Sequence, residues 1–396
     1  VGVITEVGGE TGHAAILARA LGVPAVTGIR DATRLIAANS PILIDGQSGE
    51  IVLNPVVGKI DACLANRESF DQETRDAVGA EVRECVTRDG QKIHLYANIG
   101  RPFEVEQISR HHLDGVGLFR TEYLFLDEPV MPSFDRQREL YQEIAAALDN
   151  RPLTVRTLDF GGDKRPAFLD PQFEANPNLG LRGLRFSLMA SQELFRTQVR
   201  AVLHAAKDHD VRIMLPMVLG AADLSQAIDL ILEIAQQEEC ADLPAIGALI
   251  ETPAAVFAIE EILAGSDFIS IGTNDLTQFI LAADRNAVAM IDDYTVLHPS
   301  VLRAVHQVIQ AANRVSKPVT VCGEAAADPR VACLLVGLGA DRLSMSPVSA
   351  ARVRFAIRAC HQRSLKELAE AALACHSGDA VVTLLSDTLP HTLPEF

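Results

Sequence analysis

The feature that most constrains this chain is a strand-like segment followed by a helical pattern, repeated eight times between residues 93 and 360. The predicted strands are 93–99, 115–119, 153–159, 213–218, 246–250, 268–271, 319–321 and 342–345. The predicted helices are 103–112, 136–148, 192–207, 222–237, 254–264, 301–315, 330–338 and 350–360. This α/β pattern has the number of units and the size of a closed (β/α)8 TIM barrel, and an open doubly wound sheet is the alternative.

The residues before the barrel predict a small α/β unit and a linker. Strand-like residues 3–5 lead into a glycine-rich turn and a helix, and 42–45 and 50–53 predict two short strands. We expect residues 1–55 to be part of a small domain, 56–88 a charged linker helix, 89–365 the barrel and 366–396 a C-terminal tail. Because the chain starts at Val1 inside a strand-like run, we expect it to be a piece of a longer protein.

Composition excludes several classes of partner. The net charge of −17 argues against nucleic acid or an anionic membrane surface, so an anionic substrate would need local arginines. Seven cysteines without a CxxC pair favour a reducing compartment over a disulfide framework or a zinc site. The sequence shows neither a signal peptide nor a run that could cross a bilayer. We therefore expect a cytoplasmic protein without membrane insertion.

Polar residues follow most of the predicted strands at their carboxyl ends, where ligands bind in this fold. They include Arg120, Arg156, Glu251, Asn274, Asp275 and Cys322, and Arg285 follows in the same motif as Asp275. The three arginines could supply donors to one small dianion. Glu251 and Asp275 suit a Mg²⁺ ion that completes its shell with substrate oxygens. Cys322 could be a general acid, or else a small buried core residue.

His13 is a candidate of another kind, because it lies at the predicted N-terminus of a helix, just after Gly12. The amides and dipole at such an end disfavour the imidazolium and would stabilise a phosphoryl group once it is attached. A neutral imidazole keeps a lone pair and can act as a nucleophile. The alternative is an ordinary polar residue in a first helical turn.

Taken together, the motifs resemble a known family over nearly the whole chain. GGETGHAAILARALGVPAVTG resembles the phosphohistidine signature of the phosphoenolpyruvate-utilising enzymes. GLFRTEYLFLD, VRTLDFGGDK, NPNLGLRGLR, ETPAA, SIGTNDLTQ, AADR and CGEAAADP resemble the barrel motifs of Enzyme I, the phosphoenolpyruvate-protein phosphotransferase family. The resemblance implies transfer of the phosphoryl group of phosphoenolpyruvate to a histidine with release of pyruvate, and onward transfer to an HPr-like histidine phosphocarrier protein. It also implies a Mg²⁺ cofactor, a swivelling phosphohistidine domain in residues 1–55 and a homodimer through the barrel.

The resemblance assigns a role to each matching residue. His13 would accept the phosphoryl group, and Cys322 would protonate the enolpyruvate carbon. Substrate binding would fall to Arg120, Arg156, Lys164, Asn274 and Arg285, and metal binding to Glu251 and Asp275. Gly12 departs from the family pattern, which has Ser or Thr before the histidine, and this puts a hydroxyl contact to the phosphohistidine in doubt.

Three further expectations depend on the sequence. The alternative functions are that of a pyruvate phosphate dikinase or phosphoenolpyruvate synthase, and that of a non-catalytic regulatory module that binds phosphoenolpyruvate. The helices late in the barrel are rich in small apolar residues, as in VACLLVGLGA, and this favours a homodimer made by the barrel. Residues 1–55 hold little apolar material, so this chain alone should bind phosphoenolpyruvate well but phosphorylate His13 slowly or not at all.

Overall fold

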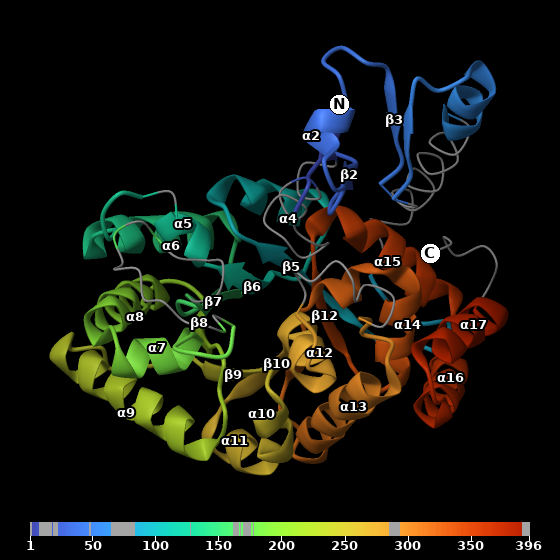
Figure 1. Ribbon diagram of the computed structural model, residues 1–396. Coiled ribbons are helices and arrows are strands. Elements are labelled where there is room, and N and C mark those ends of the chain that lie inside the picture. The colour runs from blue at the N-terminus through green and yellow to red at the C-terminus, as the bar shows by residue number, and fades with distance from the viewer. Residues whose placement is uncertain are drawn as a thin grey trace.

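Eight parallel strands close into a barrel in the order β10-β11-β12-β5-β6-β7-β8-β9 (Figure 1). The computed structural model describes residues 2–7, 18, 23–46, 49–64, 84–126, 128–160, 166, 168, 176, 178–284 and 294–389. The strands are β5 His94–Ile99, β6 Val116–Arg120, β7 Leu153–Arg156, β8 Val211–Leu215, β9 Ile246–Ile250, β10 Phe268–Ile271, β11 Val319–Val321 and β12 Arg342–Met345. Because β12 pairs with β5, the sheet has no edge, so the predicted barrel is confirmed and the open sheet is wrong.

The four strands that follow β8, β9 to β12, have the same first and last residues in the structure as in the prediction. β8 itself begins two residues earlier than the predicted 213, because Arg212 interrupts the apolar run in the sequence. In the structure Arg212 pairs with Asp210 on the exposed side, at 3.0 Å and 2.7 Å. The strand also ends earlier than predicted, since Met217 has a φ of 56°, which no strand residue adopts.

Helices alternate with the strands and surround them (Figure 1). They include α4 Glu106–Arg110, α6 Phe134–Ala147, α8 Gln192–Ala206, α9 Ala221–Gln237, α10 Pro253–Phe257, α11 Ile259–Gly265, α13 Pro299–Arg314, α14 Pro329–Gly337 and α15 Ala350–Ala359. The predicted helix 254–264 is thus two helices. The sequence did not predict α5 Glu122–Leu126 and α7 Gly183–Met189, which lie in the connections after β6 and β7. A further helix, α12 Thr273–Leu281, follows β10.

The barrel interior is filled by side chains and is not a pore. Leu118, Met214, Leu249, Phe268 and Cys322 form one buried cluster, contributed by β6, β8, β9, β10 and the end of β11. A larger apolar core lies between the strands and the helices. This division is that of a TIM barrel, whose interior supports the chemistry at one end.

Two helices follow the barrel, α16 Gln362–Ala374 and α17 Gly378–Thr388. Leu365, Leu368, Ala369 and Ala372 of α16 are buried, and α16 packs on α14. Because α14 is covered in this way, all of its residues are buried. The small apolar residues of VACLLVGLGA thus belong to the core of this chain, and they do not support the expected homodimer.

The N-terminal residues form small elements that project from the barrel in Figure 1. Strands β1 Val3–Ile4 and β2 Ala25–Val26 pair in parallel, and β3 Ile42–Ile44 and β4 Ile51–Leu53 form the predicted pair of short strands. Residues 57–64 of the predicted linker are helical, 65–83 lie outside the described residues, and Val86 bridges Lys92. Throughout the residues that the structure places, the helices are too short or too polar to span a membrane.

Candidate active site at the carboxyl ends of the barrel strands

Six of the predicted site residues lie at the carboxyl ends of the strands. Arg120 and Arg156 are the last residues of β6 and β7, Glu251 follows β9, Asn274 and Asp275 are in the first turn of α12, and Cys322 follows β11. All except Asn274 are buried. His13, Lys164 and Arg285 lie outside the described residues.

Both arginines are paired with carboxylates. Arg120 Nη2 donates to Glu324 Oε1 at 2.7 Å. Arg156 Nη2 donates to Glu122 Oε2 at 2.9 Å, and its Nη1 lies 3.2 Å from Asp159 Oδ2. Burial by itself would lower the pKa of Arg156, but the charges of Glu122 and Asp159 outweigh it and raise that pKa. The guanidinium groups are therefore permanently charged and fixed in direction, as a binding site for an anion requires.

Arg156 also keeps one unused donor. Its Nε is buried, and no described residue accepts a hydrogen bond from it. An unpaired buried donor costs about 1–3 kcal/mol, so proteins rarely keep one without a use. An oxygen of an anionic ligand at this end of the barrel could accept a hydrogen bond from this atom.

Arg182 is a third buried arginine at this end of the barrel, and no role was assigned to it from the sequence. It precedes α7 and is 3% exposed. Its Nε and Nη2 each donate to Asp159 at 3.1 Å, and its Nη1 and Nη2 donate to Asp275 at 2.8 and 3.0 Å. It lies within the motif NPNLGLRGLR but does not directly follow a predicted strand. A search for polar residues at strand ends could therefore not find it.

The two predicted metal ligands are buried neighbours. Glu251 is 1% exposed and Asp275 is 6% exposed. Burial first, and then the like charges of Asp275 and Asp159, raise the pKa of Glu251 to about 8 against the opposing effect of Arg156 and Arg182. Glu251 Oε1 accepts from Met217 N at 2.7 Å. Gly272 makes room for the carboxylate, since a Cβ there would lie 2.8 Å from Glu251 Oε2.

These carboxylates form a pair, not a complete metal cage. In the part of the chain that the structure describes, no group of three or more His, Cys, Asp or Glu side chains could hold a metal ion. Two hard oxygen ligands plus water and substrate oxygens nevertheless make an ordinary Mg²⁺ site. Burial and the like charges of Asp275 and Asp159 raise the pKa of Glu251, and a divalent cation bound there would favour its ionised form.

Cys322 is held as a neutral thiol. It is 2% exposed, and burial, together with the charge of Glu251, raises its pKa to about 12 against the effect of Arg156 and Arg120. The thiol donates to Ile271 O at 3.5 Å. The next residue must be glycine, because a Cβ on Gly323 would lie 1.7 Å from Thr273 Oγ1. Cys322 thus belongs to the interior cluster and also carries a proton at neutral pH next to the charged residues.

Asn274 connects two of the strand ends. Its Oδ1 accepts from Glu324 N at 3.2 Å, and its carbonyl accepts from Tyr294 Oη at 3.0 Å. The same Glu324 carries the carboxylate that pairs with Arg120. Any displacement of Arg120 toward a ligand is therefore coupled to the loop that follows Cys322.

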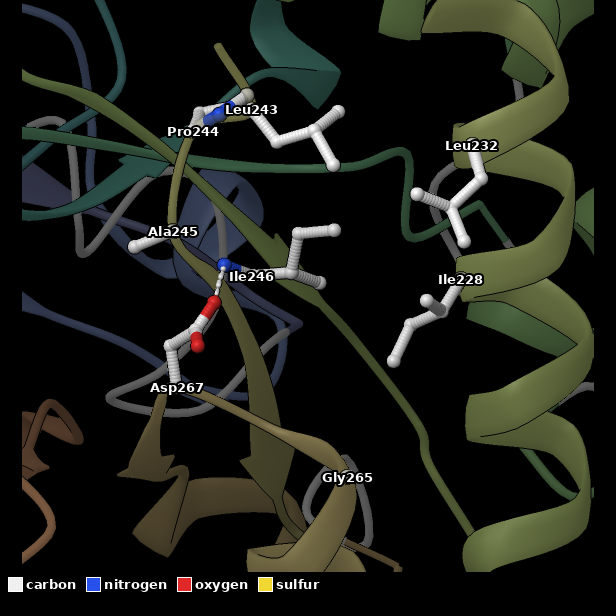
Figure 2. A pocket seen from close by; sticks show the side chains of 8 residues that line it. All are labelled: Ile228, Leu232, Leu243, Pro244, Ala245, Ile246, Gly265 and Asp267. Atoms are coloured by element: carbon white, nitrogen blue, oxygen red, sulfur yellow. Dashed lines mark hydrogen bonds between the residues drawn. The ribbon is translucent and has the colours of Figure 1, made fainter.

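A hollow elsewhere on the barrel is unrelated to this chemistry. Figure 2 shows it between α9 and the beginnings of β9 and β10, with Ile228 and Leu232 facing Ile246 across it. Asp267 at its edge is used structurally, since its Oδ2 accepts from Ile246 N at 2.8 Å. This is the amino-terminal end of the strands, opposite to the end where Glu251 and Asp275 lie, and that end of a TIM barrel serves stability.

Comparisons with known proteins agree with the geometry. Residues 75–362 match the family described as "PEP-utilising enzyme, PEP-binding domain", and residues 1–49 match "PEP-utilising enzyme, mobile domain". A phosphoenolpyruvate-protein phosphotransferase of Staphylococcus carnosus is 37% identical over 392 residues, which are 98% of this chain and 68% of that protein. The protein of the same name from Listeria innocua is 36% identical over 389 residues, 97% of this chain and 68% of that protein.

Among solved structures, a citrate lyase from Burkholderia xenovorans LB400 superposes with a TM-score of 0.45 at 16% identity, over 79% of this chain and 98% of that chain. The sequence matches decide the family, because the mobile domain matches the N-terminal residues and the PEP-binding domain matches the barrel that follows them. From the buried arginines, carboxylates and thiol at one end of the barrel, and from relatives at 37% identity, the chain belongs to the PEP-utilising enzymes, in the phosphoenolpyruvate-protein phosphotransferase family.

Proposed function

We propose that this protein transfers the phosphoryl group of phosphoenolpyruvate to His13, releases pyruvate, and passes the phosphoryl group on to an HPr-like histidine phosphocarrier protein. The observation that carries the proposal is the meeting of Arg120, Arg156, Glu251 and Cys322 at one end of a barrel whose relatives are named for this reaction. The relatives' name also favours this reaction over that of a dikinase or a regulatory module.

The arginines would bind the substrate. Arg120 and Arg156 present charged, fixed guanidinium groups, and the unpaired Nε of Arg156 supplies a donor that phosphoenolpyruvate oxygens can satisfy. Asn274, Lys164 and Arg285 would complete the substrate contacts. Burial of Arg120 and Arg156 strengthens their interactions with the substrate, because the competing water is absent.

Glu251 and Asp275 would hold Mg²⁺. The ion would supply positive charge to the phosphate and carboxylate oxygens of the substrate. In the structure Arg182 contacts both oxygens of Asp275, so Arg182 already neutralises part of the charge that the cation would meet. Burial and the charges of Asp275 and Asp159 raise the pKa of Glu251 to about 8, and the positive charge of the cation would favour its ionised form.

Cys322 would supply the proton. When the imidazole nitrogen of His13 takes the phosphoryl group, the bond between phosphorus and the enol oxygen breaks and leaves the enolate of pyruvate. Its negative charge is shared by that oxygen and C3, and the thiol proton of Cys322 passes to C3 to form the methyl group. A thiol with a pKa of about 12 does not lose its proton to water at neutral pH, but a carbanion is basic enough to take it. The thiolate formed then regains a proton from solvent.

Assembly and location complete the proposal. We propose a homodimer through the barrel, supported by large apolar side chains exposed at the ends of α7 and α10, Met189 at 74% and Phe257 at 82%. We also propose that the protein works in the cytoplasm, where the seven free thiols that the structure shows would stay reduced.

The test is the phosphoenzyme. The intact protein, with any chain that precedes residue 1, is mixed with phosphoenolpyruvate and Mg²⁺, and phosphohistidine is located by mass spectrometry under alkaline conditions. We expect one phosphoryl group on His13 and one equivalent of pyruvate. His13→Ala should abolish both, while its binding of phosphoenolpyruvate stays normal. Phosphate on another residue, or none, would overturn the proposal.

A further inference from the structure

Asn98 ties together the carboxyl ends of three neighbouring strands. It lies on β5 and is 7% exposed. Its Nδ2 donates to Cys322 O at 2.9 Å and to Ser344 O at 3.2 Å. Ser344 Oγ, on β12, donates to Asn98 Oδ1 at 2.6 Å. One side chain therefore reaches from β5 past β12 to the residue that follows β11.

The two carbonyls need such a donor because the pairing of β11 with β12 stops short of them, although Ser344 is still paired with Tyr96 of β5. The pairing of β11 with β12 ends at Val321 and Leu343. Cys322 and Ser344 come next in the chain, and both are buried. A buried carbonyl without a partner is costly, and an amide group has two N–H donors that can serve two carbonyls at once.

Ser344 decides which way the amide faces. Because its hydroxyl donates to Oδ1, the NH₂ group of Asn98 is turned toward the carbonyls and not away from them. Gly117 allows this arrangement, since a Cβ there would lie 2.5 Å from Ser344 Oγ. The network is thus complete: each polar atom of the Asn98 amide has a partner.

The backbone of Cys322 is consequently held from two sides. Its N donates to Ile271 O at 3.1 Å on the β10 side, and its carbonyl accepts from Asn98 on the β12 side. Fixing both peptide groups fixes the direction of the Cα–Cβ bond, and so the position from which the thiol approaches a ligand. The Asn98 bond is the side-chain part of this support and can be removed by substitution.

We propose that Asn98, oriented by Ser344, is a positioning residue for proton transfer from Cys322. The proposal rests on the proposed function, in which Cys322 protonates C3 of the enolate. Arg120 and Arg156, which would bind the substrate, lie on β6 and β7 and make no hydrogen bond to this network among the described residues. Loss of Asn98 should therefore affect the proton transfer much more than the binding.

The experiment separates the two effects. Dissociation constants of phosphoenolpyruvate with Mg²⁺ are measured by calorimetry, and pyruvate formation in the intact protein is followed in single turnovers. Asn98→Asp keeps the shape of the side chain but cannot donate to the carbonyls. Misplacement by about 1 Å can cost on the order of 10²-fold in rate. We expect a roughly 10- to 100-fold slower pyruvate formation for this variant, with binding within about twofold, and a smaller loss for Ser344→Ala.

Two controls make the result specific. Gln310→Ala removes another half-buried amide, which donates to Leu338 O at 3.2 Å on the outside of the barrel, and should change neither quantity. In a Cys322→Ala background, Asn98→Asp should cause no further loss of rate, because the residue acts through the thiol.

The outcomes distinguish the two hypotheses. If Asn98→Asp weakens phosphoenolpyruvate binding as much as it slows pyruvate formation, or slows the Cys322→Ala protein by the same factor, the positioning role is wrong and Asn98 only supports the fold. If Cys322→Ala turns over at the unmodified rate, or the unmodified protein yields no pyruvate, the proposed function itself fails.

Discussion

Replacing Glu251 by Gln should make the metal-free protein more stable at alkaline pH. Glu251 has its pKa raised from 4.5 to about 8 by burial and by the charges of Asp275 and Asp159. Between these two pH values the folded protein binds a proton that the unfolded chain has lost, so stability falls as pH rises. At about 1.4 kcal/mol per pH unit, the full loss is roughly 5 kcal/mol above pH 8.

The substitution isolates this effect because glutamine has nearly the same shape. Its Oε1 can still accept from Met217 N, as Glu251 does at 2.7 Å. At pH 5 the two proteins should have similar free energies of unfolding. At pH 9 Glu251→Gln should be more stable by roughly 3–5 kcal/mol, since it has no proton to lose.

The assay is urea unfolding followed by circular dichroism from pH 5 to 9, with a chelator to remove divalent cations. Glu233→Gln, which removes a half-exposed carboxylate on α9, is the control and should shift stability equally at every pH. Adding Mg²⁺ at pH 8 should stabilise the unmodified protein by mass action, and the Glu251→Gln variant much less. A stability difference between the variant and the unmodified protein that does not change with pH would refute the reasoning, because it would show that Glu251 is already ionised at pH 5.

Three further predictions concern ligand binding, the proton donor and assembly. Glu251→Ala or Asp275→Ala should remove the coupling between Mg²⁺ and phosphoenolpyruvate in calorimetry, and equal affinity with and without Mg²⁺ in the unmodified protein would contradict the site. Cys322→Ser should slow pyruvate release by orders of magnitude while phosphoenolpyruvate binds nearly normally, whereas an equal loss of binding would indicate a packing role. Light scattering at micromolar concentration should give the mass of a dimer, and a monomer mass would exclude the proposed assembly.

Much of the candidate site could be predicted from the polar residues that directly follow the predicted strands. Arg120, Arg156, Glu251 and Cys322 each follow an apolar run directly, and parallel strands in a closed barrel bring their carboxyl ends together. Arg182 could not be found in this way, because it comes from the long connection between β7 and β8. Its partners Asp159 and Asp275 are far from it in sequence and meet it only in the folded barrel.

The sequence was misleading where one pattern has two structural explanations. The small apolar residues of α14 fit an exposed dimer surface as well as a buried helix, and the packing of α16 decides for the core. Likewise, the residues 254–264 have helical spacing throughout, but the structure divides them into α10 and α11. Periodicity reports which face of a helix is apolar, not what covers that face.

By itself, then, the sequence determined the barrel and the identity of the chemical groups at its mouth, because the alternation of strands and helices and the residues at strand ends are local properties of the chain. Only the tertiary structure decided the protonation of those groups and their supports. Glu251 has a raised pKa and Cys322 keeps its proton because burial and neighbouring charges from other strands set their electrostatics. Asn98 reaches Cys322 only because the barrel closes, which leaves only β12 between β5 and β11.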